Sequence, residues 1–129
     1  METYVLVDSS QKATGVSNSY VYNLKKVLRG VHKVDLLSAA FQKLTSCTHV
    51  VLDITEFRSP SNYDTNFGVI NNFAETNSNI AYTTNSFYPI TTWMNPIDIG
   101  KITVTWRDPT GSTILMNDHS FLLKVHHYK

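Results

Sequence analysis

The stretch that decides the fold is KITVTWRDPTG, residues 101–111. Its apolar residues Ile102, Val104 and Trp106 alternate with polar ones, which is the pattern of a strand with one buried face. The following DPTG, residues 108–111, carries the preferences of a type I turn and ends in a glycine that can adopt a positive φ. We therefore expect a half-buried strand, a tight turn and a returning chain at this point.

The same two-residue period recurs through most of the chain. It predicts strands at 4–7, 19–25, 49–57 and 120–128, and less clearly at 67–73, at 80–82 or 87–88, and in the segment that returns over 114–116. Segment 31–41 fits either a short helix or a buried strand, and its alternation favours the strand. The count is then about eight, which is the number of strands in a jelly roll. We predict an all-β fold, an antiparallel β-sandwich of single jelly-roll type.

Length and composition limit what this domain can do. The chain has 129 residues, so we expect residues 1–129 to form a single domain. Only 16% of the residues are charged and the formal net charge is +1, which argues against nucleic-acid binding through a broad basic surface. Cys47 is the only cysteine, so no intrachain disulfide can form, and we expect a reducing compartment. We see no secretory signal and no apolar run that could span a membrane.

The sequence lacks the motifs of the common catalytic and nucleotide-binding sites. The adjacent His126 and His127 would point to opposite faces of a strand and could not bind one metal ion. Cys47 and His49 would share a face, yet no orienting or oxyanion group can be identified for them. We therefore predict no catalytic residues, no metal ligands and no cofactor.

The remaining charged residues also fit structural roles. Asp53 and Glu56 should lie on opposite faces of one strand, and Asp108 and Asp118 belong to a turn and to a break before a strand. A basic cluster falls at 25–33 and reads as a solvated turn between strands, with an interaction patch for an acidic protein surface as the alternative. This cluster contains Lys25, Lys26, Arg29, His32 and Lys33.

The order of several segments resembles small β-sandwich proteins of the nucleocytoplasmic large DNA viruses, which are minor structural proteins of the virion. The segments that carry this resemblance are VLVDSS (5–10), NSYVYNL (18–24), 27–31, VDLLSA (34–39), VLDITEF (51–57), FGVI (67–70), ITV (102–104), DPTG (108–111) and DHSFLL (118–123). The resemblance implies a capsid-associated role without catalysis. It also implies contacts with the major and other minor capsid proteins in a homo- or hetero-oligomer, and a location in the virion after synthesis in the host cytoplasm.

Three functions follow as hypotheses of different classes. The first is a structural protein of a large DNA virus particle that acts through protein–protein contacts. The second is a carbohydrate- or receptor-binding module, in which Trp93, Tyr88 and Tyr63 would line a shallow site. The third is an enzyme, which would need a pocket that holds Cys47, His49 and a buried carboxylate.

Overall fold

The computed structural model describes the chain as a β protein. The described residues are 1–11, 14–16, 19–42, 49–57, 68–71, 79–83, 90–108, 110–114 and 118–129. Their strands are β1 (Glu2–Asp8), β2 (Thr14–Val16), β3 (Ser19–Gln42), β4 (His49–Ile54), β5 (Gly68–Asn71), β6 (Asn79–Thr83), β7 (Ile90–Arg107) and β8 (Ser120–His126). Two single turns of 3-10 helix complete them, η1 (Ser9–Gln11) and η2 (Thr55–Phe57).

All the strand pairs are antiparallel and belong to one sheet. The order of its main path is β1-β8-β3-β7-β4-β5, and β2 and β6 each pair with β3 as well. The all-β, antiparallel character predicted from the sequence is therefore confirmed. The predicted division into two stacked sheets is not confirmed, because hydrogen bonds join the described strands continuously.

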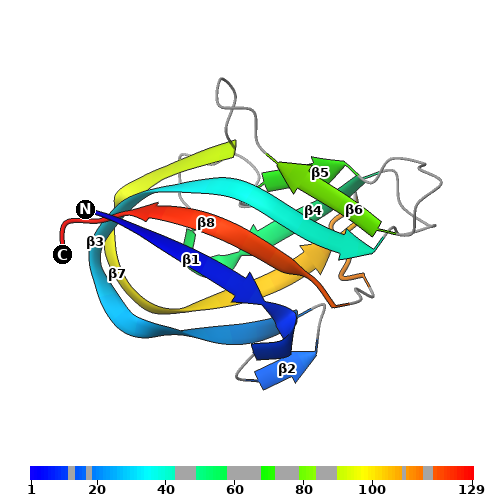
Figure 1. The fold of residues 1–129 in the computed structure, drawn as a ribbon, viewed down its shortest axis with the longest axis horizontal. Coiled ribbons are helices and arrows are strands. Elements are labelled where there is room, and N and C mark those ends of the chain that lie inside the picture. Colours follow the sequence, from blue (N-terminus) through cyan, green and yellow to red (C-terminus); the bar gives the residue numbers. More distant parts are fainter. Residues whose placement is uncertain are drawn as a thin grey trace.

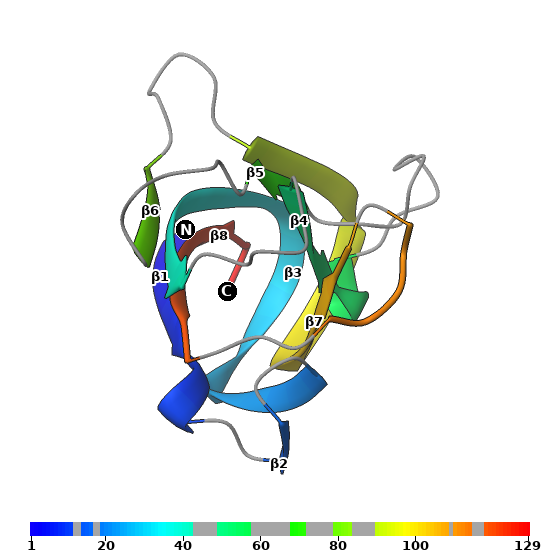
Figure 2. The same ribbon diagram turned by 90° about the vertical axis from the view of Figure 1, so that its right-hand side faces the viewer.

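The two longest strands give the sheet its shape. β3 has 24 residues and β7 has 18. Figure 1 shows both strands curving round the same end of the molecule, where the two chain termini also lie. The register between them shifts three times between Asn23 and Lys33, which is how bulges bend a paired ribbon. Figure 2 shows the result, a single sheet that folds over on itself.

This bend corrects two expectations about the strands. The predicted strands 19–25 and 31–41 are parts of one strand, β3, so the observed strands do not correspond one to one with the expected strands. For the same reason, the basic cluster lies inside a strand and not in a turn. The chain turns without ending because Gly30 takes a φ of 66°, which other residues rarely adopt. Strand conformation for 31–41 is confirmed.

β7 is also longer than predicted. The alternation suggested a strand from residue 101, whereas β7 begins at Ile90 and contains Pro96. Proline cannot donate to a strand ladder, and Pro96 lies where the register between Trp93 and Ile97 shifts. The bulge therefore accommodates the proline inside the strand.

The other predicted strands agree in position with the observed ones. β1, β4, β5, β6 and β8 fall on the expected segments, and β2 was not predicted. Residues 87–88 and 115–117 lie outside the described residues. The turn at Asp108 is confirmed, since its backbone oxygen accepts a hydrogen bond from Gly111 N at 3.0 Å and Gly111 has a φ of 93°.

The folded sheet buries its concave face against itself. The rings of Phe41, Trp106 and Phe121 meet there from β3, β7 and β8, with centroids 5.6 Å and 6.3 Å apart. The predicted alternation of β8 is visible in its burial, with Phe121, Leu123 and Val125 fully buried and the residues between them half-buried. One core therefore joins both halves of the sheet.

Replacement of Gly30 tests the bend. A Cβ at this position would lie 2.4 Å from Tyr128 Cδ2, and the positive φ adds backbone strain. We expect Gly30→Ala to lower the free energy of unfolding by about 1–3 kcal/mol in urea denaturation. Gly100→Ala is the matched control, because its Cβ would only touch Val27 at 3.4 Å and should change stability by about 0.5 kcal/mol or less. Equal decreases in the free energy of unfolding of the two variants would contradict this explanation of the bend.

Candidate functional site

Strand β1 is an edge of the sheet. In the described part of the chain it pairs only with β8. Met1 and His127 exchange both of their backbone hydrogen bonds, at 2.7 Å and 2.9 Å. Since the groups that face the partner alternate in an antiparallel ladder, the N–H and C=O groups of Glu2, Tyr4 and Leu6 point away from β8. This side of β1 is an unpaired backbone edge.

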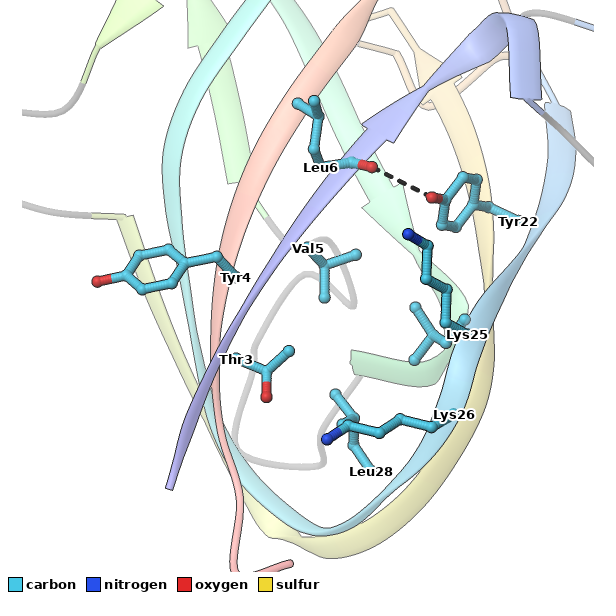
Figure 3. A pocket seen from close by; sticks show the side chains of 9 residues that line it. Thr3, Tyr4, Val5, Leu6, Tyr22, Lys25, Lys26 and Leu28 are labelled. Carbon is cyan, nitrogen blue, oxygen red and sulfur yellow. Dashed lines mark hydrogen bonds between the residues drawn. The ribbon is translucent and has the colours of Figure 1, made fainter.

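A cleft lies beside this edge, between β1 and the first half of β3. It has a volume of about 600 Å³ and is lined by Thr3, Tyr4, Val5, Leu6, Tyr22, Leu24, Lys25, Lys26 and Leu28. Figure 3 shows Thr3 and Val5 of β1 and Lys25 and Lys26 of β3 turned towards the space between the two strands, while Tyr4 points away from it. The Tyr22 hydroxyl donates to the Leu6 backbone oxygen at 3.3 Å and closes one end of the cleft. We call this space the β1–β3 cleft.

The second wall of the β1–β3 cleft is also an unpaired strand edge. β3 pairs with β7 on one side, while its other side pairs with β2 at 19–21 and with β8 from Lys33 onward. Between these stretches no described strand pairs with that side of β3. The cleft therefore separates two strand edges that both retain free backbone groups.

The lining combines apolar side chains with two cations. Val5, Leu24 and Leu28 belong to or pack against the hydrophobic core. Lys25 and Lys26 extend towards the space between the strands in Figure 3, and neither has an ion-pair partner among the described residues. An apolar surface with two ammonium groups that pair with no described carboxylate suits an apolar ligand that carries negative charge.

The outer face of the neighbouring strands exposes large hydrophobic side chains. Tyr4 and Leu6 of β1 are 60% and 58% exposed, and Trp93 of β7 is 60% exposed. The ammonium groups of Lys124 and Lys33 lie over the Tyr4 and Trp93 rings, 5.9 Å and 4.8 Å from their centroids. These cation–π contacts shield only part of each ring.

A polar cluster connects the strands on this outer face. His126 Nε2 lies 3.0 Å from Asp35 Oδ2, and Thr91 donates to Asp35 Oδ1 at 2.6 Å. Burial raises the pKa of Asp35, but the hydrogen bonds from Thr91 and His126 and the charge of Lys33 together hold it below its ordinary value. No sequence pattern indicates this cluster, because its members come from three strands that only the fold brings together.

The histidines behave as the strand pattern predicted. His127 is buried and joined to Thr3 Oγ1 by a 2.7 Å hydrogen bond, while His126 lies on the opposite, half-buried face. His32 stacks on Tyr128, with centroids 4.6 Å apart. The described residues contain no group of three or more His, Cys, Asp or Glu that could hold a metal ion.

Ser9, Asp118 and His119 lie close together but do not form a catalytic triad. Ser9 Oγ accepts a hydrogen bond from the backbone N–H of His119 at 3.0 Å. The Nε2 atom of the His119 ring accepts a 3.0 Å bond from Trp106 Nε1 and lies 2.7 Å from the Tyr20 hydroxyl. The indole can only donate, so the lone pair of this ring nitrogen is already occupied by the bond from Trp106 and is not free to take a proton from Ser9. No sequence pattern indicates this buried network, because it joins segments that are distant in the chain.

The acidic residues weighed in the sequence bind different partners in the structure. Asp53 binds Arg107 at 2.9 Å, whereas Glu56 accepts from the backbone and hydroxyl of Thr103. Asp108 accepts hydrogen bonds within its own turn. Cys47, Tyr63, Tyr88 and the side chain of His49 lie outside the described residues, so the predictions on them stay predictions.

The basic cluster divides into parts with different surroundings. Arg29 pairs with Asp98 at 3.2 Å on the surface, His32 stacks on Tyr128, and Lys33 covers Trp93. Only Lys25 and Lys26 remain without such a partner in the residues that the structure describes. The interaction patch that the sequence left as an alternative is thus reduced to two lysines at the β1–β3 cleft.

Comparisons of the sequence with protein-family models and with curated proteins found no relative. No protein-family model matches the chain, and no curated protein matches its sequence. The resemblance to viral structural proteins therefore stays a prediction. In the described part of the chain, no helix has the length and apolarity needed to span a membrane.

The lowered pKa of Asp35 predicts how the stability of the fold depends on pH. Because its pKa is lower in the folded than in the unfolded chain, its stabilisation is present above about pH 4 and is lost as the pH falls through the folded pKa. We expect Asp35→Asn to lower stability by about 1–3 kcal/mol at pH 7, and the difference from the wild type to shrink below about pH 4. Urea denaturation from pH 3 to pH 7 measures this. A difference that stays constant over this range would contradict the assignment.

Proposed function

We propose that this protein is a non-enzymatic structural protein that acts through contacts with other proteins. The observation that carries the proposal is the edge of β1 that no described strand pairs with, bordered by the exposed side chains of Tyr4 and Leu6. A free strand edge is a template for pairing with another chain, and proteins commonly cover or blunt such edges. A partner that covers β1 would satisfy its backbone groups and bury the two hydrophobic side chains.

We propose further that the folded sheet acts as the two layers of a jelly-roll-like sandwich. The support is that β3 and β7 each continue through the bend, so that each contributes to both halves around one core. In this reading the jelly roll is a single ribbon closed at one end by two long strands.

The setting that we propose is the virion of a large DNA virus, as a minor capsid or capsid-associated component. It is supported by the order of the strand and turn segments in the sequence. The partners would be the major capsid protein and other minor capsid proteins. The edge of β1 suits such a role, because pairing of strand edges joins subunits without any chemistry at the interface.

A carbohydrate- or receptor-binding module is the second candidate. Trp93 favours it, since its ring is 60% exposed and stands beside Lys33, whose partner across the sheet on β8 is His126. An exposed ring next to polar groups is the usual platform for a sugar. Saturable binding of a glycan that Trp93→Ala abolishes would favour this function over the first.

Incorporation into particles tests the first proposal. We expect quantitative mass spectrometry to find the protein at a fixed ratio to the major capsid protein in particles purified from cells that make it. Leu6→Glu, on the exposed face of β1, should reduce incorporation at least tenfold without lowering the melting temperature. Val27→Glu is the control and should leave incorporation unchanged, because Val27 is 50% exposed but belongs to β3 and not to the edge of β1.

Absence of the wild-type protein from the particles would overturn the structural function. Equal incorporation of Leu6→Glu and the wild type would show that the edge of β1 is not the contact surface.

A further inference from the structure

We propose that the β1–β3 cleft receives an extended, acidic peptide segment of a partner protein, which adds to β1 as a strand. This inference rests on the proposed function, since it names the kind of partner segment that the protein contacts. It is carried by three features of the cleft: two strand edges that no described strand pairs with, an apolar floor, and two lysines without ion-pair partners among the described residues.

β1 and the first half of β3 face each other across the cleft without being paired as neighbouring strands of the sheet. Neighbouring strands in a sheet lie about 4.8 Å apart and join by their backbones. Here the backbones of β1 and β3 do not meet, and a hydrogen bond between them needs the whole side chain of Tyr22 to reach Leu6. An inserted strand could use the outward N–H groups of Glu2, Tyr4 and Leu6 and the C=O groups of Glu2 and Tyr4, whereas the Leu6 C=O already accepts from Tyr22.

The two walls also define the direction of pairing. β1 and the first half of β3 run in opposite directions in Figure 1. A segment that lies antiparallel to β1 would therefore run parallel to that part of β3. We assign the main pairing to β1, because β1 is straight and its free groups form one regular row, whereas β3 is irregular after Asn23.

The side chains of the cleft define the sequence of the segment. Successive side chains of a strand point to opposite faces, so every second residue would enter the floor formed by Val5, Leu24 and Leu28. These residues should be apolar. The residues between them would face outward, within reach of Lys25 and Lys26.

Charge selects an acidic partner. The neighbouring cations already have partners, Arg29 with Asp98 and Lys124 with Glu2. Lys25 and Lys26 have none among the described residues, so they would gain most from an Asp or Glu on the segment. A fatty acid would match the apolar floor and the lysines, but it would leave the backbone row of β1 unpaired. The row of outward backbone groups on β1 therefore favours a peptide, which can pair with it, over a fatty acid.

A displayed library of random ten-residue peptides, selected against the full-length protein, tests the proposal. We expect the selected peptides to alternate apolar residues with Asp or Glu. Synthetic copies should bind in calorimetry, and copies with N-methylated amides on the edge that faces β1 should bind at least tenfold more weakly. The lysines should contribute as well, so the double variant Lys25→Glu/Lys26→Glu should bind at least tenfold more weakly.

Tyr4→Pro is the sharpest variant. Tyr4 N–H points away from β8, so proline removes a group of the free edge without breaking a bond of the sheet. We expect Tyr4→Pro to weaken binding at least tenfold and Tyr4→Thr, which keeps the N–H, to weaken it by less than about threefold. The N-methylated peptides give the same information if Tyr4→Pro does not fold.

Recovery of no binder would overturn the proposal, as would binders that are insensitive to both Tyr4→Pro and N-methylation. Binding of dodecanoate that displaces the peptides and is unaffected by Tyr4→Pro would assign the cleft to an amphiphilic anion instead. The result of the peptide-binding experiment can be distinguished from the result of the particle experiment. A protein that is present in particles but binds no peptide would lose only this inference, and one that binds peptides but is absent from particles would lose only the virion role.

Discussion

The continuity of β3 and β7 through their common bend is the constraint on which the rest of the structure depends. A twisted antiparallel sheet has two faces, and a chain of this size can bury one of them only if the sheet covers itself. Bulges and the positive φ of Gly30 allow this without a break in the pairing of the two strands. The core then forms between the two halves of one ribbon, with Trp106 and Phe121 at its centre.

A single sheet that folds over on itself keeps strand edges that a closed barrel would not have. β1 ends one side of the strand order, and the first half of β3 loses its neighbour where the ribbon turns. The β1–β3 cleft is thus a direct consequence of the bend. The edge of β1, which carries the exposed Tyr4 and Leu6, therefore lies beside the cleft.

The sequence predicted the local parts of this fold better than their connection. Alternation located most strands, and the turn at Asp108 followed from residue preferences alone. It could not show that 19–25 and 31–41 form one strand, because charged residues such as Lys25 and Lys26 at a bulge look the same as those of a turn. The cleft was missed as well, since it depends on pairing between strands far apart in the chain. The basic cluster could be located in the sequence, but which of its cations pair with described carboxylates depends on the fold.

Both ends of the β1–β3 cleft are fixed, which bears on how readily it could bind. Tyr22 joins Leu6 at one end. At the other, Arg29 of β3 exchanges backbone hydrogen bonds with Lys129, at 2.8 Å and 3.1 Å, just after β8. β1 in turn pairs with β8, so a continuous series of hydrogen bonds surrounds the cleft. Walls held in this way cannot easily close on themselves, and a segment that enters would not have to order them first. Preorganisation of this kind lowers the entropic cost of binding.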